Sequence, residues 1–402
     1  MPKLLQVNVV ANSGSTGKIA ENIGKLAIKN GWESYIAYGR GKPKSSSHLI
    51  RIGNNWDMYM HGIQSRLFDN HGLASVGATR RFIEEIERLK PDVIHLHNIH
   101  GYYLNYKLLF EYLATINTPV VWTLHDCWSF TGHCAYFDMV KCNKWQSGCK
   151  ECRFKELYPV SSVFTRSNKN YLIKKKCFTS LNNLILIPVS EWLFQILNSS
   201  FMAGVNKRKI YNGIDIELFH PISNAKNIDT DKFRILGVAN IWEERKGLSD
   251  FIKLRSLLSD EYIITLVGLN DEQIKKLPKG INGVTRTNGV RELVEYYNVA
   301  DVLVNPTFED NFPTVNMEAL ACGTPVITYR TGGSPEILSE ETGIVVEKGN
   351  LVELKSAIET IKNNTKKHYS AACRKRAVEK YNKNDRFEEY IELYNELIYK
   401  NH

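Results

Sequence analysis

Three carboxylates lie close together in the chain, the pair Glu309-Asp310 and Glu318, and they suit the binding of hydroxyl groups. The apolar run Ala300–Asn305 before them predicts a buried strand, and Pro313 fits a helix start, where its missing N–H would be unpaired in any case. We therefore expect a strand, an acidic loop and a helix N-terminus, the place where open α/β sheets bind ligands. The N–H groups of Thr314 and its neighbours suit a diphosphate, so the segment predicts a sugar-nucleotide site.

Two cations, Arg245 and Lys246, follow another predicted strand, Phe233–Ala239. At the carboxyl end of a parallel strand they would lie at the same edge of the sheet as the acidic loop. Such a pair can neutralise a diphosphate leaving group, the arginine through a bidentate fork and the lysine as a point charge. A solvated surface turn is the commoner outcome for such a pair taken alone, and that alternative stays open.

A glycine-rich turn, Gly14-Ser-Thr-Gly17, follows the first predicted strand, Leu5–Val10. It is not a P-loop, because Lys18 is followed by Ile19 and the glycine spacing is wrong. The turn lets the backbone approach a ligand at the N-terminus of the next helix, with Gly17 as the candidate contact. A plain strand-to-helix turn fits these residues equally well.

Histidines follow two further predicted strands. His125 comes at the end of Pro119–Leu124, and His95, His97 and His100 cluster at the end of the preceding strand. A histidine at a strand's carboxyl end can polarise a substrate or carry a proton near neutral pH. A purely structural role for these histidines fits the pattern equally well.

Five of the eight cysteines fall between Cys127 and Cys152. Four of them have a spacing that suits a tetrahedral structural zinc site, and a cytosolic protein is not expected to hold stable disulfides. Free thiols are the equal alternative. The four candidate ligands are Cys134, Cys142, Cys149 and Cys152.

The composition is that of a globular protein of 402 residues, with 43% hydrophobic and 24% charged residues. No apolar run approaches the ~18–20 residues that cross a bilayer, and the N-terminus resembles a core strand more than a signal peptide, so we expect a cytoplasmic protein. The net charge of +9 favours anionic partners such as nucleotide phosphates or a membrane surface. No nucleic-acid motif is present.

The basic segment Tyr171–Phe178 is a candidate for peripheral contact with the inner face of a membrane, although a solvated basic helix is favoured.

Strand-like and helix-like segments alternate along the chain, and the alternation restarts near Lys232. This predicts an α/β protein with two doubly wound, Rossmann-like domains. The expected boundaries are 1–205 with a Cys-rich insert at 127–152, 206–380, and a terminal helical segment at 381–402. The polar stretch Asn206–Asp231 is the expected linker.

Several motifs together resemble glycosyltransferase family 4, whose members are retaining, use sugar nucleotides and have the GT-B architecture. The matching segments are Gly14–Gly17, Asp92–His97, Thr123–Asp126, Val189–Trp192, Asn212–Asp215 with Phe219 and Pro221, Lys246-Gly247, Asp310–Pro325, and Gly332-Gly333 with Pro335-Glu336. The resemblance implies that the two domains face a central crevice and that the C-terminal helix crosses back to the first domain. It also places the Cys-rich insert in a subset of the family that builds surface polysaccharides such as capsules.

The resemblance further implies roles for single residues. Glu318 corresponds to the ribose-binding glutamate, Lys246 to the phosphate-binding lysine, and His125 to the histidine beside the reacting sugar carbon. The family's partner arginine is absent upstream of Lys246, and Arg245 is the candidate replacement. Either Asp310 or Glu309 faces the donor sugar. The loop and helix start that complete the expected donor site include Asn311, Phe312 and Thr314.

The expected activity is transfer of a sugar from a UDP- or GDP-sugar to a hydroxyl of a glycan or lipid-linked acceptor, with retention at the anomeric carbon. No catalytic metal is expected, because the two cations can stabilise the leaving diphosphate. Two alternatives stay open. A sugar-nucleotide epimerase of the same architecture would convert a donor without any acceptor, and a non-catalytic nucleotide-sugar-binding protein would bind a donor and turn over nothing.

Overall fold

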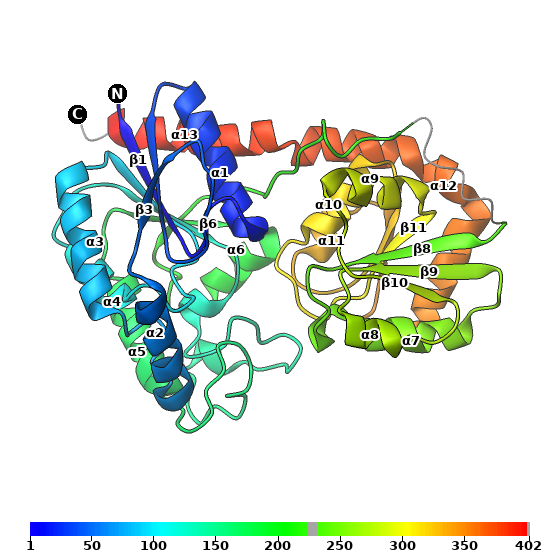
Figure 1. The fold of residues 1–402 in the computed structure, drawn as a ribbon, viewed down its shortest axis with the longest axis horizontal. Helices are drawn as coiled ribbons and strands as arrows, with labels where there is room; N and C mark the ends of the chain where they lie inside the picture. Colours follow the sequence, from blue (N-terminus) through cyan, green and yellow to red (C-terminus); the bar gives the residue numbers. More distant parts are fainter. Residues whose placement is uncertain (223–230, 400–402) are drawn as a thin grey trace. The chain divides into compact units, whose positions relative to one another are not determined.

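The computed structural model describes residues 1–222 and 231–399. The chain divides into two compact units, which we describe separately. Unit 1 consists of Met1–Tyr211 and the described residues from Phe387 onward, and unit 2 is Asn212–Arg386. Each unit is a parallel sheet with helices on its faces (Figure 1). This confirms the predicted class of two doubly wound α/β domains.

Unit 1 contains a seven-stranded parallel sheet in the order β3-β2-β1-β4-β5-β6-β7. The central strands are buried on both faces, which explains their near-continuous apolar runs. The chain leaves β1 toward one edge of the sheet and returns beside it at β4, so the switch point lies between these two strands. The strands are β1 (Lys3–Asn8), β2 (Glu33–Tyr38), β3 (His48–Arg51), β4 (Val93–Leu96), β5 (Val120–Leu124), β6 (Leu184–Pro188) and β7 (Asn206–Lys207).

The helices of unit 1 cover both faces of this sheet. Apolar side chains of α1 pack in one core cluster with those of α13, while α4 and α5 meet β5 through the rings of Phe110, Phe178 and Trp122. The helices are α1 (Gly14–Lys29), α2 (Asn55–Phe68), α3 (Val76–Leu89), α4 (Tyr106–Leu113), α5 (Ser167–Phe178) and α6 (Glu191–Asn198), with short 3₁₀ turns η1 (Trp128–Phe130) and η2 (Lys144–Gln146).

The last described helix, α13 (Lys383–Tyr399), belongs to unit 1 from Phe387 onward. Its Tyr390 hydroxyl lies 3.0 Å from Thr123 Oγ1, and its Tyr394 hydroxyl lies 2.6 Å from His95 Nδ1. Both tyrosines are almost fully buried. These buried polar contacts define where the helix sits on the apolar face, because an unmatched hydroxyl there would be costly.

Unit 2 contains a six-stranded parallel sheet in the order β10-β9-β8-β11-β12-β13, with its switch point between β8 and β11. The strands are β8 (Phe233–Val238), β9 (Tyr262–Val267), β10 (Ile281–Val284), β11 (Val302–Asn305), β12 (Val326–Tyr329) and β13 (Gly343–Val346). The helices are η3 (Glu244–Lys246), α7 (Leu248–Leu257), α8 (Asp271–Lys275), α9 (Val290–Val299), α10 (Thr314–Ala321), α11 (Ser334–Ile337) and α12 (Leu351–Tyr381), which kinks at Thr365.

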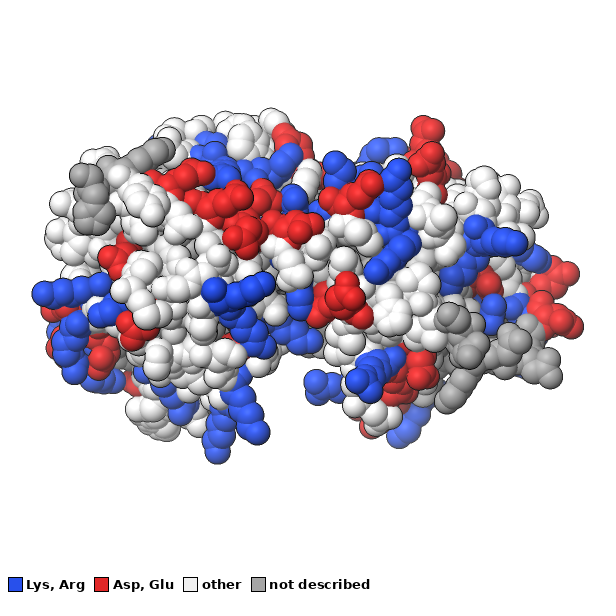
Figure 2. Space-filling model, turned by 90° about the horizontal axis from the view of Figure 1, so that it is seen from above, with Lys and Arg blue, Asp and Glu red and all other residues white. Residues whose placement is uncertain are grey.

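Part of the predicted linker Asn206–Asp231, namely residues 223–230, lies outside the described residues. Across residues 1–222 and 231–399, no helix combines the length and the apolar character that crossing a bilayer requires. On the face shown in Figure 2, basic and acidic side chains are interspersed, so the positive net charge does not form one continuous field there.

Candidate functional site

The switch point of unit 2 brings three loops together. The loop after β11 donates from Phe308 N to Arg245 O (2.7 Å) and accepts at Asn311 O from Gly333 N (3.0 Å). Two glycines permit this approach. A Cβ on Gly247 would lie 2.2 Å from Pro306 O, and one on Gly332 would lie 1.7 Å from Asp310 O, and both residues have positive φ. The acidic loop is therefore held on both sides by backbone contacts that only glycine allows.

Both predicted cations lie against the acidic loop. Lys246 Nζ is 2.5 Å from Asp310 Oδ2, and this ion pair is partly exposed, at 21% and 18% of the two side chains. Arg245 donates to Glu309 O at 3.2 Å and pairs with Glu243 at 2.9 Å. The Glu309 side chain is buried. Asp310 is thus a carboxylate in direct contact with the lysine.

Helix α10 starts directly after the acidic loop. Pro313 occupies the N-cap with an extended backbone, one position before the first helical residue, Thr314. Within the helix Asn316 is fully buried and its Oδ1 accepts from Asn305 Nδ2 at 2.8 Å. Helix α10 is therefore fixed to the end of β11, and its first N–H groups follow the acidic loop in the chain.

Glu318, one turn further along α10, accepts a 2.8 Å hydrogen bond from the Tyr297 hydroxyl. Burial, together with this carboxylate, raises the pKa of Tyr297 well above its usual value, so the hydroxyl remains a donor. Asn311 and Phe312 are buried, and the Phe312 ring meets Tyr381 edge-on at 5.9 Å. Unit 2 contains eight of the predicted site residues, and they lie in the turn after β8, in the loop after β11 and on α10. They are Arg245, Lys246, Glu309, Asp310, Asn311, Phe312, Thr314 and Glu318.

In unit 1, His125 takes part in a hydrogen-bonded chain with His97 and Gln6. Gln6 Nε2 donates to Ala20 O (2.9 Å), so its Oε1 is the atom that accepts from His97 Nε2 (3.1 Å). His97 Nδ1 lies 3.2 Å from His125 Nε2. Burial lowers the pKa of His97 well below its usual value and that of His125 to about 4, so both rings are neutral near pH 7. A neutral His97 that donates from Nε2 must accept at Nδ1, which makes His125 Nε2 the donor.

The other predicted histidines have different partners. His95 contacts Thr123 and Tyr394 through its two nitrogens, so it serves the core beneath α13. His100 Nε2 lies 2.8 Å from Asp126 Oδ2. Burial raises the pKa of Asp126, but the charge and hydrogen bond of His100 outweigh that effect and hold it below its usual value. Unit 1 therefore places two polar pairs, His97–His125 and His100–Asp126, at the carboxyl ends of β4 and β5.

Gly17 and its turn lie at the same edge of unit 1. Gly17 is buried, and a Cβ there would meet Val10 and Asn12 of the preceding loop at 3.1–3.3 Å. The close approach that Gly17 permits is thus to the chain itself. Gly14, which has positive φ and open space around its Cα, is the more accessible glycine of the turn.

The zinc prediction finds no support. Within residues 1–222 and 231–399, no group of three or more His, Cys, Asp or Glu side chains is arranged to hold a metal ion. Cys134 and Cys149 are buried free thiols, and burial raises the pKa of Cys149 to about 11. Cys149 Sγ accepts from Gly132 N at 3.1 Å, and Ser167 Oγ donates to Cys149 O at 2.7 Å. Contacts with Gly132 and Ser167 therefore hold Cys149 in place.

The structure does not support the predicted membrane segment in α5. Tyr171, Lys174 and Phe178 are buried. The Lys174 ammonium donates to Trp128 O (2.6 Å) and Thr131 O (3.0 Å). One face of the segment packs into the interior of unit 1, so it is not the fully solvated basic helix either.

Two further candidate residues, Gln6 and Tyr297, were not predicted. Gln6 carried a signal, since it is a polar residue within the buried apolar strand β1, and buried polar groups need a partner. Tyr297 carried none, because its partner Glu318 lies on a different helix.

The chain is similar to known glycosyltransferases. Residues 17–218 match the family described as Glycosyltransferase Family 4, and residues 232–364 match Glycosyl transferases group 1. The chain is 26% identical over 370 residues to the putative colanic acid biosynthesis glycosyl transferase WcaC of Escherichia coli, covering 87% of this chain and 89% of that protein. It is 27% identical over 224 residues to the N,N'-diacetylbacillosaminyl-diphospho-undecaprenol alpha-1,3-N-acetylgalactosaminyltransferase of Campylobacter jejuni, covering 50% and 58%.

A solved structure shares the fold. Anabaena Alr3699/HepE in complex with UDP-glucose superimposes with a TM-score of 0.66 at 14% identity, covering 98% of this chain and 99% of that chain.

Proposed function

The chain belongs to glycosyltransferase family 4, and we propose that it moves a sugar from a nucleoside diphosphate sugar, a UDP- or GDP-sugar, to a hydroxyl of a glycan or lipid-linked acceptor in the biosynthesis of a surface polysaccharide. The proposal includes retention at the anomeric carbon. The observation that carries it is the Lys246–Asp310 ion pair in the loop before α10, the helix that carries Glu318.

In this proposal unit 2 binds the donor. Lys246 and Arg245 carry the charge that a leaving diphosphate needs, and the N–H groups at the start of α10 add preorganised dipoles. Glu318, oriented by Tyr297, receives ribose hydroxyls. Asp310 pairs with Lys246, and in this proposal it is the carboxylate that faces the donor sugar.

Unit 1 provides the acceptor side. The neutral His125 would lie beside the donor sugar, as the family resemblance implies, and the His100–Asp126 pair offers an acceptor for a substrate hydroxyl at the adjacent strand end. The Campylobacter jejuni relative has a diphospho-undecaprenol group in its name, which supports a lipid-linked acceptor. The proposal further includes a cytoplasmic location with peripheral contact at the membrane.

Removing the Lys246 and Glu318 side chains, one at a time, tests the donor site. Lys246→Ala should lower kcat/KM at least about a hundredfold, because a preorganised charge that faces the leaving group is lost. Glu318→Ala should lower it comparably through weaker donor binding. The measurement is product formation from a panel of UDP- and GDP-sugars with a lipid diphosphate-linked acceptor, and NMR of the product reports the anomeric configuration.

Lys253→Ala, an exposed lysine on the neighbouring helix α7, is the matched control and should retain full activity. Wild-type rates in folded Lys246→Ala or Glu318→Ala would sink the donor assignment. Conversion of a donor with no acceptor present would indicate an epimerase instead. Donor-dependent thermal stabilisation without turnover on any acceptor would indicate a binding protein.

A further inference from the structure

Helix α2 of unit 1 presents its apolar side chains outward. At the helical period, Trp56, Tyr59, Met60, Ile63 and Leu67 form one stripe, and Trp56 and Tyr59 are 68% and 61% exposed. The opposite face buries the polar residues His61 and Ser65. This is the reverse of the pattern by which a surface helix covers its own core, so the stripe is not explained by packing within unit 1.

A loop from a distant part of the chain extends the stripe. Phe68, at the end of α2, stacks on Phe164 with ring centroids 6.3 Å apart and planes 9° from parallel. Ser162 N donates to Arg66 O at 2.7 Å. We call the combined region the α2–loop surface. It consists of Trp56, Tyr59, Met60, Leu67 and Phe68 on α2 and Tyr158, Val160, Val163 and Phe164 on the loop.

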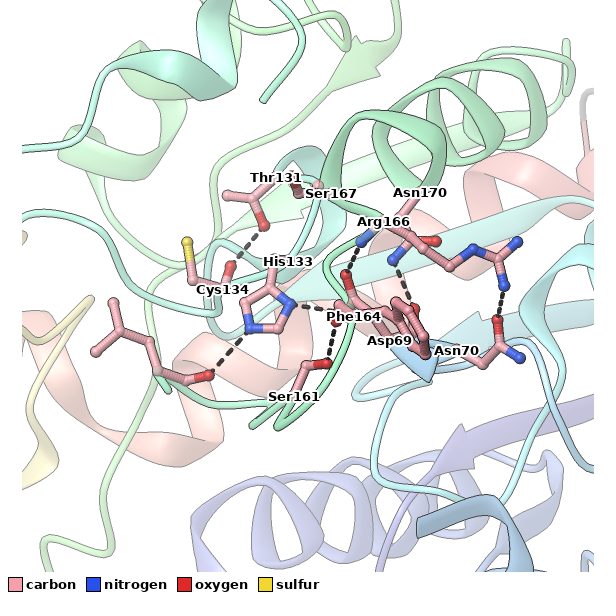
Figure 3. A network of polar contacts seen from close by, with 12 residues as sticks. Asp69, Asn70, Thr131, His133, Cys134, Ser161, Phe164, Arg166, Ser167 and Asn170 are labelled. Carbon is pink, nitrogen blue, oxygen red and sulfur yellow. Dashed lines mark hydrogen bonds and ion pairs between the residues drawn. The ribbon is translucent and has the colours of Figure 1, made fainter. Parts of the chain in front are cut away.

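A buried polar network fixes the loop to the helix. Asp69, directly after α2, accepts from Arg166 N (2.7 Å) and contacts His133 Nδ1 (2.8 Å), while its carbonyl accepts from Asn170 Nδ2 (2.8 Å) (Figure 3). Because these contacts hold both segments, the α2–loop surface is one preformed patch. It contains nine of the nineteen large apolar side chains that are exposed in the described part of the chain. A concentration of this kind marks an interaction site.

The charges around the patch indicate the partner. Arg66 is exposed on α2, Lys155 donates to Ser162 O within the loop, and Arg166 lines a hollow together with Phe68 and Phe164. Arg51 contacts Asn55 at the start of the helix. The nearby acids are fewer. Asp57 caps the helix and lies 3.8 Å from Arg81, and Glu156 is exposed on the loop.

We propose that the α2–loop surface docks on an anionic lipid bilayer, with Trp56, Tyr59, Leu67 and Phe164 entering the interface and the arginines contacting lipid phosphates. Tryptophan and tyrosine suit the boundary between acyl chains and headgroups, and basic residues beside an apolar helix face favour anionic lipids. This inference rests on the proposed function, which includes a lipid-linked acceptor. Tyr158 links the patch to the strand ends, since its hydroxyl lies 3.4 Å from His100 Nδ1.

Vesicle flotation of the full chain tests the proposal. Wild type should bind vesicles of equal parts phosphatidylcholine and phosphatidylglycerol, and bind phosphatidylcholine alone weakly. Trp56→Ser/Tyr59→Ser/Leu67→Ser should reduce the partition coefficient at least tenfold. Arg51→Gln/Arg66→Gln should reduce binding to the anionic vesicles roughly fivefold for each cation removed, from about 1 kcal/mol per basic residue, and should weaken its salt dependence.

The matched control replaces three exposed apolar residues of unit 1 that lie outside the patch, Ile28→Ser/Leu49→Ser/Leu172→Ser, and should bind as wild type does. Far-UV circular dichroism and donor-induced thermal stabilisation verify that each variant is folded. If the patch triple fails these checks, quenching by nitroxide-labelled lipid, compared between wild type and Trp56→Phe, still reports whether Trp56 enters the bilayer.

Equal vesicle binding by the patch triple and the control triple would overturn the proposal. So would loss of a wild-type dimer in the patch triple with vesicle binding unchanged, which would identify the surface as an interface between copies. Lys246→Ala should bind vesicles normally. Failure of the donor assignment would therefore appear in that variant's activity, and failure of the lipid proposal only in flotation.

Discussion

At the residue scale, the least expected feature is the chain from Gln6 through His97 to His125. Gln6 is fully buried in β1 and makes two hydrogen bonds, one to Ala20 O and one to His97 Nε2. Since both histidines are neutral near pH 7, the Gln6 amide makes His97 Nδ1 an acceptor and so favours a proton on His125 Nε2. Gln6 is thus a positioning residue for His125 in the proposed reaction.

Gln6→Glu should change the pH dependence of the reaction. A carboxylate beside His97 raises the pKa of that ring, and a protonated His97 can no longer accept from His125 Nε2. The pH at which kcat falls on the acid side of its pH profile should therefore be higher than in wild type.

Gln6→Met should lower kcat about tenfold, which corresponds to raising the activation barrier by about 1.4 kcal/mol, with the donor KM unchanged. Steady-state kinetics across roughly pH 4–8 measures both effects.

A merely structural role for Gln6 would alter thermal stability but leave the pH profile in place. Ser34→Ala removes a buried hydroxyl of the neighbouring strand β2 that contacts the Ser47 hydroxyl. It is a suitable control and should leave the profile unshifted. A wild-type profile in Gln6→Glu would contradict the assignment.

At the element scale, the Cys-rich insert is held by α5. The buried Lys174 ammonium binds two carbonyls of the insert and lies 3.6 Å from the centroid of the Trp128 ring. Burial lowers the pKa of Lys174 to about 7, against the opposing influence of Cys149 and Asp69. In the unfolded chain the lysine would titrate near 10.5.

The free energy of unfolding should therefore rise with pH through this window. Between about pH 7 and pH 10.5 the unfolded chain holds a proton that the folded chain has released, and below pH 7 the burial penalty is present in full. Urea titrations should show the stability of wild type relative to Lys174→Met rising by about 3–5 kcal/mol between about pH 7 and pH 10. The exposed neighbour Lys175 provides the control Lys175→Met, and a flat difference for Lys174→Met would refute the prediction.

The elements that were predictable from the sequence are those whose patterns match their burial. The apolar runs of β1, β4, β5, β8 and β11 are buried on both faces, so composition alone indicates them. The edge strand β3 was missed because its residues are largely exposed, and α2 because its apolar face points outward. The proposed donor-site residues could be named from the sequence because they follow predicted strands or begin a helix. The Gln6, Tyr297 and Lys174 contacts depend on tertiary packing between distant segments and had no local signature.

At the scale of the whole molecule, titratable groups are distributed unevenly between the units. In unit 1, burial lowers the pKa of His61 to about 3 and of His125 to about 4, and holds the pKa values of His71, His95 and His97 well below their usual range. In the described part of unit 2 the two histidines, His220 and His368, are exposed. Acid therefore acts on the folding of the two units differently.

Unit 1 should open before unit 2 as the pH falls from about 6.5 toward about 4. Below about pH 6.5 the unfolded chain binds protons at these histidines and folded unit 1 does not, so its free energy of unfolding decreases with falling pH. Hydrogen exchange of the intact chain can follow peptides of β4 and β5 alongside those of β11 and β12.

His71 gives a specific check, because it is buried among the rings of Tyr102, Trp128 and Tyr158, and its two nitrogens have no hydrogen-bond partner within the described residues. His71→Leu should reduce the pH slope of unit 1 by up to about 1.4 kcal/mol per pH unit, the value for one proton, and leave unit 2 unchanged, whereas parallel loss of protection in both units would contradict this account.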